Sequence, residues 1–556
     1  MNKTGALYRA FKSNLEMPKP NGEKKVKIYN RFGMIAFIGI MVPVSVIVGF
    51  VTYALTDLLS MFEDNTYGLL SELDIISAFA MIFGMLLMFS VLFFSSDLRF
   101  LTALPITPTS LYVARFWHTF KAENVMTSNV LFAIYIGYFA AAAKNSGIIA
   151  ALHPVALIAA VTGFFGSLLV PLIYCSIIGL IMMLALKHFR RADIYYHSSL
   201  VLFVLFAALF LLSFRSYGSV STMNYIDTLV SGNNTFTAVC NVLFPANYLT
   251  TLAIRTCSIL PLLGALAFIA ALYGLSVLLA HLTYREGLFA AAVISNKKTS
   301  RKQTSYGGPR KIFDALLIKE AKVLMRTMTY RMNCVYANLL WPILAVFVMV
   351  ETPRNEFLSG YADGLRAGDQ SGLVTLFAVV IAAAFIASGL NSIASTSFTR
   401  EGVHLDMLKY LPAPLEDQIR AKVSIAVLFT FIPEAIAVVM VTVSLGQLAM
   451  LPLYILVSFA CILIATVIGV IMDSISPYTI WSDELSALRG NLNCFFNLAA
   501  EMIAALLTGA VSYGLFKLSG SAVVTIVPVT LLLVIGGIIC VTAGLPRAKK
   551  NIEFLK

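Results

Sequence analysis

Charged residues are scarce in this sequence: they account for 12% of its 556 residues, whereas hydrophobic residues account for 59%. In soluble globular domains about a quarter of the residues are charged. The deficit excludes an ordinary soluble fold and favours a chain that crosses a membrane several times. The charge that remains is unbalanced, because 40 lysines and arginines stand against 28 acids, for a formal net charge of +12.

The sequence also lacks the motifs of common metal-binding and catalytic sites. Its seven cysteines form no C-x-x-C pair and no cysteine–histidine spacing suited to zinc. Neither a G-x-x-x-x-G-K-[S/T] segment nor any Gly-Lys dipeptide occurs, so the chain has no phosphate-binding loop of this kind. We therefore expect no metal, no cofactor and no enzymatic activity in this chain. Cys240 and Cys257 fall in one expected outer loop and could pair or stay free.

Long apolar runs are abundant, and a helix of about 20 apolar residues spans the hydrocarbon core of a bilayer. Twelve such runs occur, at roughly 33–56, 75–96, 122–143, 154–186, 198–214, 258–281, 335–350, 373–397, 424–444, 448–472, 494–515 and 523–544. The fourth is overlong and contains Pro171, and we interpret it as one kinked helix. Two passes there would place Lys187 and Arg190 on the wrong side. The expected fold class is an all-α polytopic membrane protein with about 12 transmembrane helices.

The distribution of basic residues predicts the topology, because cytoplasmic loops collect lysine and arginine. With both termini inside, 34 of the 40 basic residues fall on the cytoplasmic side. The six left outside are Lys144, Arg215, Arg255, Arg354, Arg366 and Lys517. An expected outer loop at 57–74 carries five acids and no base. The net positive charge is therefore a topology signal that requires no nucleic acid, and the chain is expected in the plasma membrane with cytoplasmic termini.

The spans divide into two sets of six. Between them lies the basic stretch NKKTSRKQTSYGGPRK (296–311), which is typical of a flexible linker. It is followed by apolar residues at helical spacing from Ile312 to Met325, which predict a surface-lying amphipathic helix; residues 6–15 form a weaker counterpart. The expected organisation is a cytoplasmic N-terminus (1–32), a first six-helix half (33–284), a cytoplasmic linker with the amphipathic helix (285–334), a second six-helix half (335–545) and a cytoplasmic tail (546–556).

One polar segment occurs twice. LTALPITPTSLYVARF (101–116) and LKYLPAPLEDQIRAKV (408–423) align at an offset of 307 residues, and each follows the second span of its half. We call them copy one and copy two. In copy one Thr107 is expected to cap a helix that begins at Pro108. In copy two Pro414 is expected at the first helical position, with two acids in the first turn. Each helix should run directly into the next span. The simpler alternative is a connecting loop that only caps two spans.

These segments resemble those of bacterial ABC exporter permeases of the second type, in particular the fused twelve-helix putative ABC exporter permeases. The resemblance covers essentially the whole chain, and SSDLRFLTALPITPTSLYVARF (95–116), SFTREGVHLDMLKYLPAPLEDQIRAKV (397–423) and KEAKVLMRTMTYRMN (319–333) carry it. It implies that each copy is a coupling helix docking on a separate cytoplasmic ABC ATPase, present in two copies, which would hold ATP and magnesium. The implied contacts are Leu104, Pro105, Pro108, Leu111, Tyr112, Arg115, Leu411, Pro412, Pro414, Glu416, Asp417, Ile419, Arg420 and Lys422.

Two acids fall within expected spans, Glu434 directly after Pro433 and Glu501 in the eleventh run. A carboxylate at bilayer depth is costly and normally faces protein or water. Both are candidates for the translocation path, and a structural hydrogen bond between helices is the alternative. Asp473, at a span end, is expected at the membrane interface.

Three functions remain open at this point. The first is the permease subunit of an ATP-driven exporter. The second is an ion- or proton-coupled secondary transporter, which also uses repeated halves but usually carries more intramembrane charge and broken spans at matched positions. The third is a membrane enzyme such as a lipid transferase, which would need clustered acids or histidines at one interface. The cargo, and whether one or two permease chains form the complex, stay open.

Overall fold

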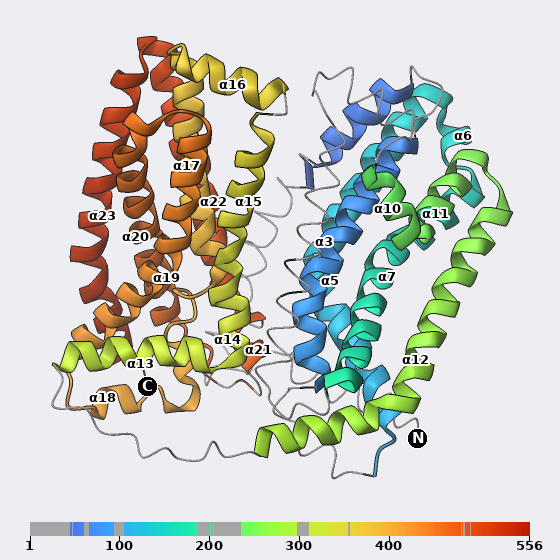
Figure 1. Ribbon diagram of the computed structural model, residues 1–556, viewed down its shortest axis with the longest axis horizontal. Helices are drawn as coiled ribbons and strands as arrows, with labels where there is room; N and C mark the ends of the chain where they lie inside the picture. Colours follow the sequence, from blue (N-terminus) through green and yellow to red (C-terminus); the bar gives the residue numbers. More distant parts are fainter. Residues whose placement is uncertain are drawn as a thin grey trace. The chain divides into compact units, whose positions relative to one another are not determined.

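The computed structural model describes residues 45–46, 48–60, 66–93, 105–186, 201, 204, 235–296, 311–353, 356–479, 481, 484–489 and 491–555. These residues form helices and no strand, and eight of the helices among them are long and apolar enough to cross a membrane. The fold is therefore that of a polytopic helical membrane protein. The described residues before position 304 form one compact unit and those after it form a second (Figure 1).

The first unit contains the apolar helix Val48–Leu59 and seven further described helices. These are α3 (Thr66–Phe93), α5 (Pro108–Ser146), α6 (Ile148–Ala151), α7 (Pro154–Leu186), α10 (Thr235–Leu243), α11 (Pro245–Thr256) and α12 (Ile259–Asn296). Helix α7 packs against α3, α11 and α12. As expected, the overlong fourth run is one helix with Pro171 inside it. Most of the runs at 33–56 and 198–214 lies outside the described residues.

The second unit contains a larger set of described helices. They are α13 (Ile312–Arg326), α14 (Met328–Tyr330), the π-turn η2 (Arg331–Val335), the 3-10 turn η3 (Tyr336–Leu339), α15 (Leu340–Glu351), α16 (Glu356–Arg366), α17 (Gln370–Asn391), η4 (Thr399–His404), α18 (Met407–Tyr410), α19 (Leu415–Ser444), η5 (Leu448–Met450), α20 (Leu451–Ile475), α21 (Glu484–Arg489), α22 (Leu492–Ser519) and α23 (Ala522–Glu553). Helix α17 packs against α22, and α20 packs against α23.

Local sequence explains where several helices begin and end. The side chains of Asp369 and Asn491 accept backbone hydrogen bonds at the starts of α17 and α22. Gly520 ends α22 in the left-handed conformation, which glycine adopts without steric cost. The expected amphipathic helix is present as α13, with Leu324 buried and Ile312 exposed.

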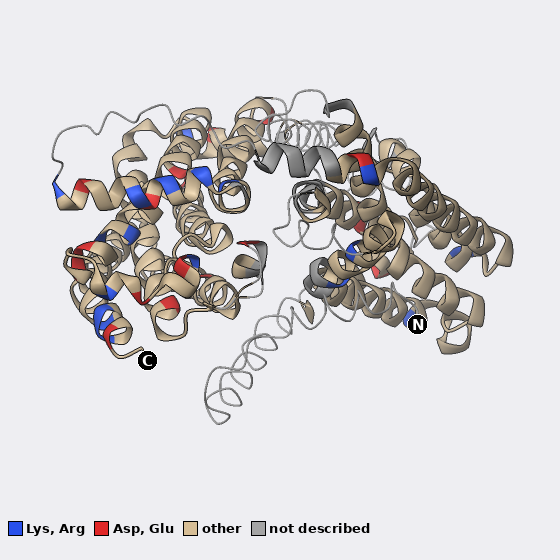
Figure 2. Cartoon of the chain, turned by 90° about the horizontal axis from the view of Figure 1, so that it is seen from below, with Lys and Arg blue, Asp and Glu red and all other residues tan. Residues whose placement is uncertain are grey.

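Within the second unit, α13, α18 and the end of α23 lie at one end of the bundle, and α16 lies at the other (Figure 1). The side chain of Lys409 in α18 donates a hydrogen bond of 2.7 Å to the carbonyl of Leu555. We call this end, which also contains copy two, the α13 end. Figure 2 views the molecule from below and colours basic and acidic positions along the ribbon of α13, whereas long stretches of the other helices carry neither colour.

The structure corrects several expected boundaries. Helix α3 begins at Thr66, so the later part of the expected outer loop at 57–74 is helical, and Asp74 is buried. A search for runs of apolar residues misses a helical turn that contains acidic residues. Helices α12 and α23 continue to Asn296 and Glu553, beyond the expected ends of their halves, because backbone hydrogen bonding does not require apolar side chains. Cys240 and Cys257 are free, so the expected alternative of a disulfide between them is not formed.

Candidate functional site

Copy one forms the start of α5. Thr107 caps the helix by accepting from the backbone of Ser110, and Pro108 takes the first helical position, as the sequence predicts. The Tyr112 hydroxyl lies 2.8 Å from Ser176 Oγ in α7, and its ring packs edge-on to Tyr284 of α12 at 5.7 Å. Copy one is therefore the first part of a long helix whose inner face is packed against neighbouring helices.

Copy two forms the start of α19 in a similar way, with one correction. Pro414 is the N-cap, and Leu415 is the first helical residue, so the proline lies one position earlier than predicted. Glu416 and Asp417 lie in the first turn, as predicted, where the helix dipole favours acids. Arg420 lies 2.6 Å from Glu416 on the exposed side of the helix.

Burial divides the fourteen predicted contact residues. Exposed or partly exposed are Pro105, Pro108, Leu411, Pro412, Pro414, Glu416, Asp417 and Arg420. Buried within their own unit are Leu111, Tyr112, Arg115, Ile419 and Lys422. Leu104 lies outside the described residues. The residues of this buried set are interior side chains. The short surface helix that the sequence predicted is instead formed, in each copy, by the first turns of a long helix, and one face of these turns packs inward.

Lys422 is the centre of a buried ionic network that joins three segments. Its ammonium lies 2.9 Å from a carboxylate oxygen of Glu320 in α13 and 2.6 Å from one of Glu401 in η4. It also donates a hydrogen bond of 3.0 Å to the carbonyl of Ser397. Lys319 of α13 pairs with Glu401 at 2.7 Å. The Lys422 side chain is 1% exposed, so it is held almost entirely by these partners.

A second buried acid anchors the same connecting segment. Asp473 of α20 accepts backbone hydrogen bonds from Phe398 at 2.6 Å and Thr399 at 3.0 Å, and a hydroxyl hydrogen bond from Thr399 at 2.6 Å. Asn493 of α22 donates to the same carboxylate at 3.1 Å. Asp473 is thus fully buried within its unit, near the end of α20. Residues 397–401 are therefore fixed to α13, α19, α20 and α22 together.

Glu401 lies outside the spanning helices and titrates far from its usual range. Burial would raise the pKa of its carboxyl, but Lys422 and Lys319 outweigh burial and hold that pKa at about 2, against an ordinary value of 4.5. Because the pKa is lower in the folded protein, the carboxylate stabilises the fold fully above about pH 4.5. That contribution is lost as the pH falls through about 2.

We therefore expect the melting temperature in detergent to decline in acid, starting near pH 4.5, in part through Glu401. Glu401→Gln should be less stable at neutral pH, and its melting temperature should change less between pH 4.5 and pH 2. Thermal unfolding followed by circular dichroism as a function of pH measures both. Parallel acid profiles for parent and variant would contradict this assignment.

Beyond this anchored segment, the chain presents apolar side chains at the surface of the α13 end. Val403, Met407, Tyr410 and Leu411 are all exposed, and Tyr410 reaches 85%. We call these four residues the α18 edge. They stand beside the exposed ion pair of Lys409 and Asp406. Exposed apolar residues among charges mark a surface that binds another protein or a membrane.

The two predicted translocation-path acids are both buried, on different helices. Glu434 lies in α19, and one of its carboxylate oxygens has no hydrogen-bond partner among the described residues. Glu501 lies in α22 and accepts a hydrogen bond of 2.5 Å from Asn497. A Cβ atom at Gly389 of α17 would come within 2.3 Å of the other Glu501 oxygen, so this glycine makes room for the acid. The hydrogen bond of Glu501 is formed within its own helix, and among the described residues the second carboxylate oxygen of Glu501, like one oxygen of Glu434, has no hydrogen-bond partner. In the described part of the chain neither acid forms the interhelical hydrogen bond of the structural alternative.

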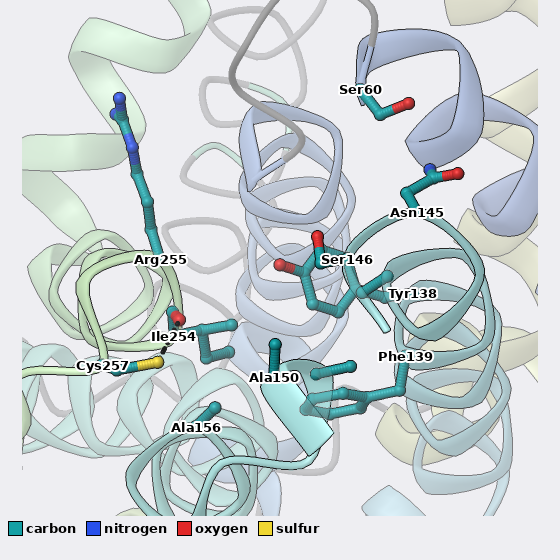
Figure 3. A pocket seen from close by; sticks show the side chains of 12 residues that line it. Ser60, Tyr138, Phe139, Asn145, Ser146, Ala150, Ala156, Ile254, Arg255 and Cys257 are labelled. Atoms are coloured by element: carbon teal, nitrogen blue, oxygen red, sulfur yellow. Dashed lines mark hydrogen bonds between the residues drawn. The ribbon is translucent and has the colours of Figure 1, made fainter. Parts of the chain in front are cut away.

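A cavity of about 600 Å³ opens in the first unit (Figure 3). Its lining comes from the end of α5, from α6, from the start of α7 and from the end of α11. Figure 3 shows Ser60 and Asn145 on one side and Arg255 and Cys257 on the other. Its lining combines hydroxyl, amide and guanidinium groups with alanines, which suits a small polar molecule or a lipid headgroup.

No protein-family model matches the chain, and no curated protein and no solved structure is significantly similar to it. The geometry of the chain itself therefore carries the functional argument. The sequence analysis identified copy two as a candidate site. It did not predict the buried contacts that hold this segment in place, which involve Lys319, Glu320, Glu401 and Asp473. The sequence feature that could have indicated these contacts is the run of neighbouring charged residues in IKEAK (318–322) and TREG (399–402), each close to an apolar span.

Proposed function

We propose that the chain is the membrane-spanning permease subunit of an ATP-driven exporter, and that the α18 edge docks on a separate cytoplasmic ATPase. The observation that carries the proposal is the combination of an exposed apolar edge with a buried ionic anchor directly behind it. A surface that transmits force needs both a partner-binding face and a rigid connection to the helices that must move.

The connection can be followed along named contacts. The α18 edge is continuous with residues 397–401, which Lys422 and Asp473 hold against α19 and α20. Helix α19 is a single element from Leu415 to Ser444 and contains Glu434. A displacement of the edge would therefore tilt or shift α19 as a unit and move Glu434, the path candidate. ATP and magnesium would be held by the partner.

Copy one would provide the corresponding contact for a second ATPase copy, since it stands at the equivalent place in the first half. Pro105 and Thr107 are exposed there, whereas Arg115, which aligns with Lys422, is buried and donates to the carbonyl of Val91. In this proposal the two docking surfaces differ. Copy two contributes Glu416, Asp417 and Arg420, and copy one has an uncharged residue at each of the three aligned positions.

One observation favours the alternative of an ion- or proton-coupled secondary transporter. In the first unit the helical path is interrupted at Phe244, between α10 and α11, and Asn247 of α11 is bonded to the buried Asp74. Broken helices next to ionisable groups occur in such transporters. Purification of the chain from its native membrane in mild detergent separates the two functions. A stoichiometric ATPase supports the exporter, and transport driven by an ion gradient in vesicles that lack any ATPase supports the alternative.

The docking surface gives a sharper prediction. The double variant Tyr410→Asp with Leu411→Asp should retain about tenfold less co-purified ATPase, equivalent to about 1.4 kcal/mol of binding. Its melting temperature should stay unchanged, because both side chains are exposed. Leu518→Asp, an exposed apolar residue near the opposite end of α22, is the matched control and should retain the ATPase. Equal ATPase recovery from the edge variant and the control would exclude this docking surface.

A further inference from the structure

A buried polar cluster lies within the first unit where α3, α7 and α11 meet. Asn247 of α11 donates through its amide to Asp74 at 2.9 Å and to Ser77 at 3.0 Å, both in α3. Ser167 of α7 donates to the Asn247 oxygen at 3.0 Å. Ser77 also donates to the backbone carbonyl of Ser167 at 3.2 Å. All four side chains are at most 1% exposed.

The cluster stands at a break in the helical path. Helix α10 ends at Leu243, and α11 starts at Pro245 after a single residue, Phe244, with non-helical backbone angles. Asn247 is the third residue of α11, so Asp74 is bonded to the first turn of a twelve-residue helix. The N-terminus of a helix carries partial positive charge, which stabilises a nearby carboxylate. Figure 1 shows α10 and α11 as two short helices of different direction, and α11 packs against α7.

Asp74 is the unusual member of the cluster. One of its carboxylate oxygens, Oδ1, accepts a hydrogen bond from Asn247. The other, Oδ2, is buried and has no hydrogen-bond partner in the part of the chain that the structure describes. Among the described residues no lysine, arginine or histidine forms an ion pair with it. A buried carboxylate without a cation is far more costly than a buried neutral group that lacks one hydrogen bond. The site therefore calls for a bound positive charge.

The titratable groups around Asp74 do not provide that charge. Cys240 of α10 interacts with it as a neutral thiol, and Tyr135 of α5 approaches the neighbouring Gly163 of α7. Glu72, two residues earlier in α3, accepts instead from Thr52 at 2.8 Å. From α7 and α11 the cluster receives hydroxyl and amide groups, which carry no charge.

We propose that Asp74 is a proton-binding site at the break between α10 and α11, which takes up a proton at Oδ2 and releases it again. A proton fits this site better than a metal ion, because Asn247 already uses both ends of its amide and one free oxygen cannot coordinate a metal. Both protonation states have support in the cluster. The Asn247 donor and the α11 N-terminus favour the carboxylate, and burial favours the acid.

Infrared difference spectroscopy on the purified full-length protein tests the proposal without requiring any transport substrate or ATPase. As the pH is lowered from about 9 to about 5, carboxylic acid bands of buried acids should appear, and one of them should belong to Asp74. Asp74→Asn should remove that band, and the matched control Glu72→Gln should retain it. Asn247→Ala should move the appearance of the band to higher pH, because the ionised form loses a hydrogen bond.

Each result decides the proposal. A titrating band that is absent in Asp74→Asn and shifted in Asn247→Ala supports the proton site. An Asp74 band of constant strength throughout that pH range would show a permanently protonated, structural acid and would overturn it. An acid band that responds to sodium chloride in place of pH would overturn it in favour of a sodium site. If Asp74→Asn fails to fold, the shift in Asn247→Ala against the unshifted band of Glu72→Gln still decides.

Discussion

Replacing Lys422 by methionine is expected to lower the free energy of unfolding by about 3–5 kcal/mol, the usual cost of removing one member of a buried ion pair. The lysine is the one cation of the network that is fully enclosed, at 2.9 Å from Glu320 and 2.6 Å from Glu401. Methionine keeps the unbranched shape and leaves two buried carboxylates to share Lys319. Most of the expected loss is therefore the cost of uncompensated buried charge.

Arg420→Met is the matched control, two residues away on the outer side of α19. Its partners Glu416 and Asp417 are partly exposed, and surface ion pairs contribute only about 0–1 kcal/mol. Thermal unfolding of both variants in the same detergent measures the difference. Adding Glu401→Gln to Lys422→Met should recover part of the stability, since it removes one of the stranded charges. Equal melting temperatures for Lys422→Met and Arg420→Met would show that the network does not support the fold.

Replacing Gly137 by alanine is expected to destabilise the first unit by about 3 kcal/mol, at the upper end of the cost of inserting a methyl group into a tight core. A Cβ at this position in α5 would lie 2.2 Å from the carbonyl oxygen of Gly49 and 3.1 Å from Thr52 Cβ. The obstructing atom belongs to the backbone of the helix Val48–Leu59 and cannot move aside by rotating a bond. The two helices cross at a pair of glycines, an arrangement common in membranes.

Gly274→Ala provides the control for this substitution. Gly274 lies in α12, where no atom comes within 4 Å of the added Cβ. Alanine there should leave stability unchanged or raise it by up to about 1 kcal/mol through helix propensity. The comparison needs only melting temperatures of the purified proteins. If Gly137→Ala has the same melting temperature as the parent protein, the two helices are not in close contact at this crossing.

The Lys422 variants also bear on the proposed coupling. In the exporter proposal, the α18 edge acts on α19 through the network that Lys422 completes. Lys422→Met combined with Glu401→Gln should then bind the ATPase normally while transport per ATP hydrolysed falls. The double variant at Tyr410 and Leu411 should instead lose ATPase binding itself. This difference distinguishes the docking surface from the connection behind it.

The amino-acid sequence by itself determined the helical membrane class, because an apolar run of about 20 residues has few other stable environments. It also determined features that depend on neighbouring residues, such as the Thr107 cap, Pro108 at the start of α5 and the single helix that contains Pro171. These features follow from local backbone chemistry and hold wherever the helix is placed.

Only the tertiary structure decided which charged residues are enclosed. Lys422 and Glu320 are 102 positions apart, and Asp74 and Asn247 are 173 apart, so no local pattern pairs them. The sequence predicted a surface helix at copy two, and packing against α13 and α20 made its inner face interior. Burial of a charge is stable only when partners from distant segments satisfy it, and those partners are brought together by the fold and not by the order of residues.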